Sequence, residues 1–145
     1  MLNFEFTKEV FTKTVRLRLL KNGIIHYTFL PNVEIDADAH VENQAALIKF
    51  TNNSKSLLLV DSDNLISITE DGRKKMREME CFAPVTVRAV VVKSLVPRLL
   101  SNFYIKFYKP IIPTKNFSNY VDAMSFLENY EKSSQNNKNN HLIVG

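Results

Sequence analysis

The sequence of 145 residues has the length of one domain, enough to bury a core without disulfides or a structural metal. Hydrophobic residues make up 45% and charged residues 23%, as in an ordinary globular protein, and no apolar run could span a bilayer. The formal net charge of +4 suits weak attraction to anionic surfaces, but no basic block indicates a nucleic-acid partner.

Cysteine usage and the first residues bear on location. Cys81 is the only cysteine, which excludes an intramolecular disulfide and a cysteine-rich zinc site. The opening stretch, MLNFEFTKEVF, carries charges within its apolar pattern and does not resemble a signal peptide. We therefore expect a protein of the reducing cytoplasm.

Residues 15–31 predict a β-hairpin. Apolar side chains recur at every second position on both sides of Asn22-Gly23, a pair that favours a turn with positive φ. Pro31 ends the second strand, and residues 2–10 could add an edge strand.

Residues 36–51 predict a helix that Asp36 caps, with Asp38 in the first turn, where the helix dipole favours negative charge. The apolar face expected from helical spacing consists of Ala37, Val41, Ala45 and Ile48, with Leu47 nearby.

Two acidic clusters raise the question of a metal site. Asp36, Asp38 and His40 would share a face on a strand and could then hold a divalent ion, but on a helix they do not converge. Asp61 and Asp63 offer oxygen ligands for a hard cation, but no third ligand lies at close spacing. Capping residues and loop acids are the favoured interpretation, and we expect no metal and no cofactor.

The rest of the chain alternates strands and helices. Strands are expected at 55–61, 84–93 and 112–117, and helices at 69–82, 94–109 and 120–130. Thr69 and Ser94 are the expected caps of the first two of these helices, and Pro97 fits a first turn. We expect one domain over residues 1–130 and, from its polar, Asn-rich composition, a disordered tail over residues 131–145.

This order predicts an α/β fold. An antiparallel hairpin leads, and the alternating helices and strands that follow build a mostly parallel sheet with right-handed crossovers.

The same plan resembles the SpoIIAA-like, or STAS-like, fold, and in particular small bacterial STAS/SEC14-like proteins of unknown function. The resemblance covers residues 15–130 and is carried by LLLVD, ISITEDGRKKM, AVVVKSLVPRLLSNFYIKF and KPIIPTKNFSNYVDAMSFL. These motifs are mostly apolar patterns, so they specify the fold better than an activity.

The resemblance also places a switch position. In the anti-sigma-factor antagonists of this fold, a strand-helix junction carries an Asp-Ser-Ser-Gly motif with one phosphorylated serine. That motif falls here on Thr69, Glu70, Asp71 and Gly72, so acids replace both serines and only the glycine matches. We therefore expect no serine switch and expect Thr69 to be a helix cap.

The helix at 95–109 has more apolar surface than one core contact needs. Its candidate ligand or dimer surface consists of Leu99, Leu100, Phe103, Tyr104, Phe107 and Tyr108. A partner chain, an apolar ligand or the last helix of the same chain could cover this surface, and a homodimer is the expected partner.

The sequence offers few candidate catalytic residues. Cys81 lies beside Phe82 in apolar company, and the sequence has neither a Gly-x-Ser-x-Gly elbow nor a Gly-rich phosphate loop. We therefore expect a non-enzymatic regulatory or protein-interaction module with an unknown protein partner. The alternative is a carrier of a small apolar or lipid-like ligand.

Overall fold

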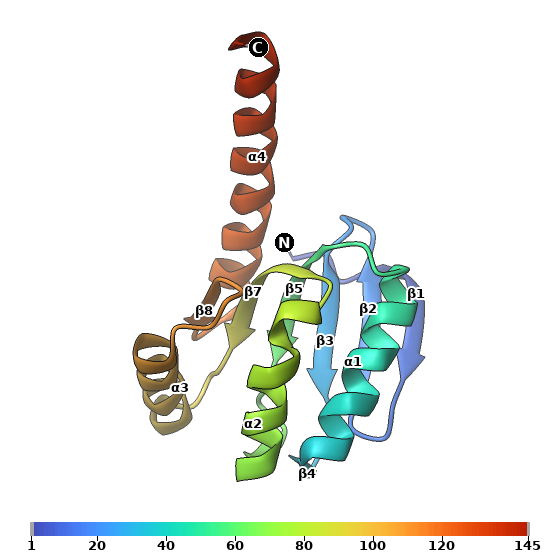
Figure 1. The fold of residues 1–145 in the computed structure, drawn as a ribbon, viewed down its shortest axis with the longest axis vertical. Coiled ribbons are helices and arrows are strands. Elements are labelled where there is room, and N and C mark those ends of the chain that lie inside the picture. The colour runs from blue at the N-terminus through green and yellow to red at the C-terminus, as the bar shows by residue number, and fades with distance from the viewer. Residues whose placement is uncertain (1, 145) are drawn as a thin grey trace.

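A computed structural model describes residues 2–144 of the chain, except for the side chains of Tyr104, Phe107, Tyr108 and residues 134–144. Six strands form one sheet in the order β1-β2-β3-β5-β7-β8 (Figure 1). They are β1 (Phe6–Phe11), β2 (Val15–Leu20), β3 (Ile25–Phe29), β5 (Ser56–Asp61), β7 (Val85–Val91) and β8 (Thr114–Phe117). The β1-β2 and β2-β3 pairs are antiparallel and the other neighbours are parallel, which confirms the expected α/β class.

The leading hairpin forms where the sequence predicted it. β2 and β3 pair from Val15 with Phe29 to Leu19 with Ile25. Gly23 in the connecting turn has φ +87°, a conformation that glycine adopts without strain. The expected edge strand also exists, as β1, and all six of its residues are exposed.

A second, two-stranded sheet was not predicted from the sequence. β4 (Val33–Ile35) pairs in parallel with β6 (Leu65–Ile68). Both strands are too short to give an alternating pattern. Their pairing places the end of β4 beside the start of the helix that follows β6.

The helices are distributed over both faces of the main sheet. They are α1 (Ala37–Thr51), α2 (Glu70–Met79), α3 (Leu95–Tyr108) and α4 (Tyr120–Val144), with a short 3-10 turn at Glu80–Phe82. Figure 1 shows α1 and α2 on one face, and α4 packs against β5 and β7 on the other. One core therefore lies under α1 and includes Leu17, Leu47 and Phe50, and the other lies under α4 and includes Leu59, Val87 and Leu127.

The face of α1 that packs on the sheet is not the predicted one. Val41 and Ala45 are exposed, whereas the buried residues are Asn43, Gln44, Leu47 and Phe50. The spacing prediction failed because it counted only apolar side chains. Asn43 is buried because Thr12 and Thr14, in the turn before β2, supply its hydrogen-bond partners.

The C-terminal segment is helical, since α4 continues to Val144. The disordered tail that polar composition predicted from Glu131 stays a prediction. No proline or glycine interrupts residues 120–144, so nothing in the backbone stops the helix. The domain boundary at residue 130 stays a prediction.

Candidate functional site

The switch-equivalent junction is a tightly built helix start. Thr69 is the N-cap of α2, as predicted, and its Oγ1 accepts a hydrogen bond from the backbone N–H of Gly72 at 3.0 Å. The backbone N–H of Thr69 donates to the carbonyl of Ile35 at the end of β4, at 2.9 Å. A Cβ on Gly72 would lie 2.4 Å from that same carbonyl oxygen, so only glycine fits there.

The two acids at this junction are exposed. Glu70 and Asp71 occupy the first turn of α2, where the positive end of the helix dipole stabilises them. A hydrogen bond from the Thr69 hydroxyl lowers the pKa of Asp71. The Thr69 hydroxyl is thus engaged by both Gly72 and Asp71, as expected of a cap, and the absence of phosphorylation stays a prediction.

The candidate surface on α3 faces solvent. Leu99, Leu100 and Phe103, together with Leu95 and Val96, are between 56% and 66% exposed. The side chains of Tyr104, Phe107 and Tyr108 lie outside the described residues. We call the surface of Leu95, Val96, Leu99, Leu100 and Phe103 the outward face of α3.

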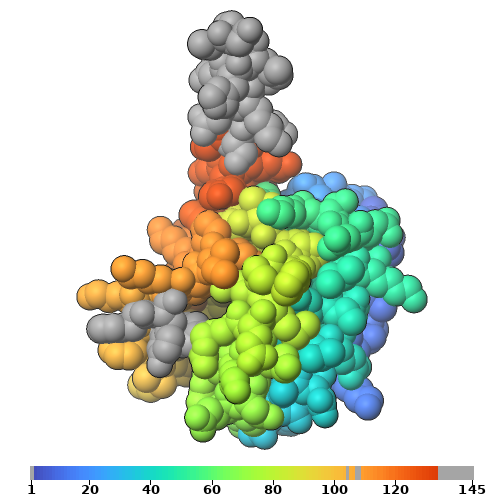
Figure 2. All heavy atoms as spheres, in the orientation of Figure 1, coloured from blue at the N-terminus to red at the C-terminus, as the bar shows by residue number. Residues whose placement is uncertain are grey.

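The other side of α3 meets the protein and is more polar. Arg98, Ser101 and Ile105 are less exposed than the outward face, and the helix contacts β8. The side-chain amide of Asn116 in β8 donates to the side-chain oxygen of Asn102 at 3.0 Å. Figure 2 shows the α3 region projecting from the side of the molecule. Among the described side chains of α3, the mostly polar side therefore faces the sheet edge, and the apolar stripe faces away from it.

A partly buried hydrogen-bond network under the start of α4 was missed by the sequence interpretation. The Tyr120 hydroxyl donates to Asp61 at the end of β5 and lies 3.2 Å from Nε2 of His26 in β3. The Phe4 ring packs against both His26 and Tyr120, with centroid distances of 5.4 and 5.1 Å. Only residues that are far apart in sequence contribute, so no local motif announces the cluster.

Burial and nearby charges determine the protonation of His26 and Tyr120. Burial, and then the nearby Arg16 guanidinium, lower the pKa of His26 to about 4, so its imidazole is neutral at pH 7. Burial, and then the hydrogen bond to Asp61, raise the pKa of Tyr120, so its hydroxyl keeps its proton. This arrangement pins α4 to β3 and β5, and it contains no nucleophile poised beside a base.

The remaining sequence candidates do not converge. Asp36 caps α1 through the Ala39 N–H, and Asp63 lies 3.6 Å from the ammonium of Lys93. Across the described residues, no group of three histidine, cysteine or carboxylate side chains could hold a metal ion. Cys81 was expected in apolar company, but the 3-10 turn leaves both it and Phe82 exposed.

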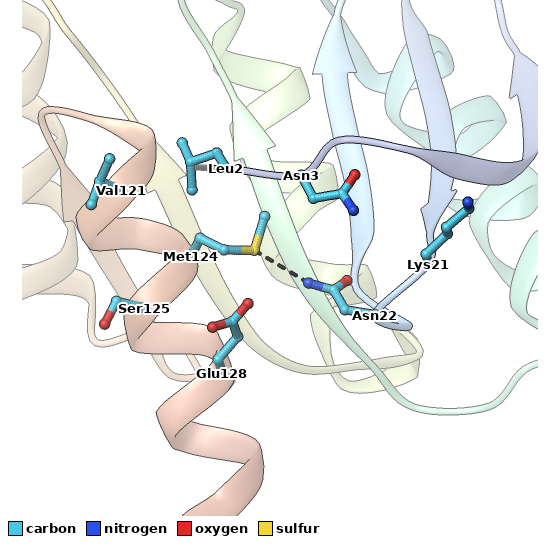
Figure 3. A pocket seen from close by; sticks show the side chains of 8 residues that line it. All are labelled: Leu2, Asn3, Lys21, Asn22, Val121, Met124, Ser125 and Glu128. Atoms are coloured by element: carbon cyan, nitrogen blue, oxygen red, sulfur yellow. Dashed lines mark hydrogen bonds between the residues drawn. The ribbon is translucent and has the colours of Figure 1, made fainter.

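A shallow depression of about 430 Å³ lies beside α4 (Figure 3). Met124 stands at its centre and accepts a weak hydrogen bond from the amide of Asn22 at 3.6 Å between nitrogen and sulfur. Leu2 and Val121 add apolar surface, and five polar side chains complete the lining: Asn3, Lys21, Asn22, Ser125 and Glu128. None of the residues predicted as a ligand site lines it.

Comparisons with known proteins agree with this fold. A family model described as "Domain of unknown function (DUF7793)" matches residues 18–131. No curated protein matches the chain. Among solved structures, an uncharacterized protein of the DUF3478 family with a SpoIIAA-like fold, from Shewanella loihica PV-4, matches with a TM-score of 0.59. It is 9% identical in sequence, and the match covers 85% of this chain and 98% of that one.

Such low identity bears on the fold alone, and it confirms the fold that the sequence predicted. The chain has the SpoIIAA-like fold and belongs to the DUF7793 family of domains of unknown function.

Proposed function

We propose that the chain is a non-enzymatic interaction module of the STAS-like type, which works in the cytoplasm by docking through the outward face of α3. One observation carries this proposal: α3 directs its polar side to the sheet edge and its apolar stripe to solvent. An amphipathic helix stabilised only by its own chain would be oriented the other way.

The energetics favour a docking role for this helix. A helix of 14 residues is marginal in water by itself and depends on packing of its apolar face. Full burial of a Leu, Val or Phe side chain contributes about 1.5–3 kcal/mol, and α3 leaves most of that contribution unused at five positions. A partner surface that covers the stripe would supply the missing stabilisation.

The α2 junction supports a module without a phosphorylation switch. Glu70 and Asp71 stand where the antagonist branch carries serines, and Thr69 is engaged as a cap. Docking would then be controlled by the availability of the partner and not by a kinase acting on this junction.

The alternative, a carrier of a small apolar ligand, finds less support. The outward face of α3 is a set of side chains on a projecting helix, not an enclosed site. The depression beside α4 has the volume of a small-molecule site, but it is open, and five of the eight residues that line it are polar.

Site-specific photo-crosslinking in the producing cell tests the docking role. A photoreactive amino acid at Leu100, which is 66% exposed, should give covalent adducts that disappear when Val96 and Leu99 are both changed to Ser. The matched control places the same group at the exposed Lys13, far from α3, where few adducts are expected. Equal yields at the two positions would contradict the proposal.

A further inference from the structure

We infer that the outward face of α3 docks on an anionic lipid surface, with the helix lying in the interface. This inference rests on the proposed function, since it names the partner of the same face. Its evidence is the placement of charge, which the docking proposal does not use.

The net positive charge of the chain comes from the segment around α3. Residues 93–121 contain five basic residues and no acidic residue; the basic ones are Lys93, Arg98, Lys106, Lys109 and Lys115. The whole chain has 19 basic and 15 acidic residues, so the remainder has 14 basic against 15 acidic residues and a net charge of −1. The excess of +4 therefore arises beside the exposed apolar stripe.

Carboxylates from neighbouring elements do not cancel this charge. Asp63 approaches Lys93 at 3.6 Å, and Glu80 pairs with Arg88 and accepts a hydrogen bond from the backbone of Ile111. None of the ion pairs among the described side chains involves the other four basic residues of the segment: Arg98, Lys106, Lys109 and Lys115. The exposed Lys106 and Lys109 are thus available to anionic headgroups. Lys115 lies over the rings of Phe117 and Phe126, and Arg98 lies on the side of α3 that meets the protein.

Basic residues lie within and beside the apolar stripe. At 100° per residue, Lys106 falls between Leu95 and Leu99, and the C-cap Lys109 follows the last turn. Apolar side chains of an interfacial helix enter the acyl boundary, while long lysine and arginine stems carry their charges back to the headgroups. Ile111, which is 71% exposed, extends the apolar surface just beyond the helix. None of the helices in the described part of the chain is long and apolar enough to cross a bilayer, so α3 would lie on the surface.

Charge also separates the alternative occupants of this face. A second copy of the chain would bring a segment with five basic residues and no acid against its own copy, which opposes the pairing. A protein partner would need a groove shaped to a projecting helix, together with carboxylates at its rim. A fluid anionic bilayer meets both requirements without a preformed shape, and we therefore favour it.

Co-sedimentation with vesicles tests the inference. The probes are vesicles of pure phosphatidylcholine and vesicles with about one third phosphatidylglycerol, a fraction that gives the surface a clear negative potential. The intact protein should bind the anionic vesicles at least about tenfold more strongly, and added salt should weaken this binding.

Two double variants address the two features of the helix. Leu99→Ser with Leu100→Ser removes apolar surface, and Lys106→Glu with Lys109→Glu reverses charge at exposed positions. Each should reduce binding at least about tenfold. The matched control, Lys13→Glu with Lys55→Glu, changes the net charge equally at exposed sites elsewhere and should retain most of the binding.

Two results would overturn the inference. One is the absence of binding to anionic vesicles at low salt. The other is binding that falls equally in the control, which would make attraction nonspecific. If either occurs while the adducts at position 100 persist, the docking proposal stands with another occupant. A stable dimer in light scattering that the Leu99 and Leu100 changes dissociate would identify that occupant as a second copy.

Discussion

α1 and α3 are helices of similar length, 15 and 14 residues, and they contradict simple amphipathic reasoning in opposite ways. α1 buries Asn43 and Gln44 and leaves Val41 exposed. α3 keeps a polar side toward the protein and exposes its apolar stripe. The helices differ in whether the chain itself supplies partners for the unusual face.

In α1 both buried polar side chains, Asn43 and Gln44, have hydrogen-bond partners within the protein. Thr12 donates to the side-chain oxygen of Asn43 at 2.6 Å, and the Asn43 amide donates to Thr14 at 2.8 Å. The Gln44 amide donates to the carbonyl of Met79 at 3.0 Å. The outward face of α3 stays more than half exposed, so the first helix is completed within the chain, whereas the proposed docking would complete the second.

The largest expected effect tests the completeness of α1. Asn43→Ala should lower the free energy of unfolding by about 3 kcal/mol, because it removes the hydrogen bonds to Thr12 and Thr14, leaves their partly buried hydroxyls without these partners and deletes a buried side chain. Val41→Ala on the exposed side should cost less than about 0.5 kcal/mol. Urea unfolding of both variants measures the difference, and a larger loss for Val41→Ala would reverse our description of this helix.

The next effect concerns the other internal polar contact, beneath α4. The pKa of His26 is lowered to about 4 in the folded state, so between its ordinary pKa and 4 the unfolded chain binds more protons. Stability should therefore fall as the pH drops from 7 to 5, by roughly 2 kcal/mol from this group. Below pH 4 both states are protonated and the contribution levels off.

Urea unfolding at the two pH values, with His26→Phe as the comparison, measures this contribution. The variant should lose clearly less stability between pH 7 and pH 5. Burial also lowers the pKa of His40, so part of the fall should persist in both proteins. If the variant lost as much stability between pH 7 and pH 5 as the original protein, His26 would not be the source of that loss.

A smaller effect sharpens the contrast on α3. Leu99→Ser with Leu100→Ser should change the free energy of unfolding by less than about 1 kcal/mol in the isolated protein, because both side chains already contact water. Leu47→Ser in α1, which is 4% exposed, is the matched change of a buried leucine and should cost several times more. Similar losses at the two sites would mean that the chain itself packs the α3 stripe.

At the start of α2 we expect no phosphorylation. Incubation with a kinase of the anti-sigma type should leave the intact mass unchanged, because acids replace the switch serines and Thr69 is engaged as a cap. Mass spectrometry detects a single phosphate readily. A stoichiometric phosphate on Thr69 would show that the junction is a switch after all.

The fold could be predicted well because its signals are local. The Asn22-Gly23 turn, the caps at Asp36 and Thr69, and the apolar run that ends at Asp61 each depend on a few neighbouring residues. The packed face of α1 could not be predicted, since it depends on hydroxyls more than 25 positions away along the chain. The hydrogen-bond network of His26, Tyr120 and Asp61 could not be predicted for the same reason, because only the folded sheet brings these residues together.

The outward face of α3 was half predicted. Its apolar excess is visible in the sequence, and Leu99, Leu100 and Phe103 were named from it. Its orientation required the structure, because a helical pattern does not say which side meets the sheet.

A single tryptophan tests the central claim most directly, because the chain has none of its own. Leu100→Trp labels the outward face of α3, and Val41→Trp labels the exposed side of α1 in a separate protein. Both should emit as water-exposed indoles in buffer. On addition of vesicles with about one third phosphatidylglycerol, the emission at position 100 should shift to the blue while that at position 41 stays unchanged. No shift at position 100, or equal shifts at both positions, would contradict a lipid-docking role for α3.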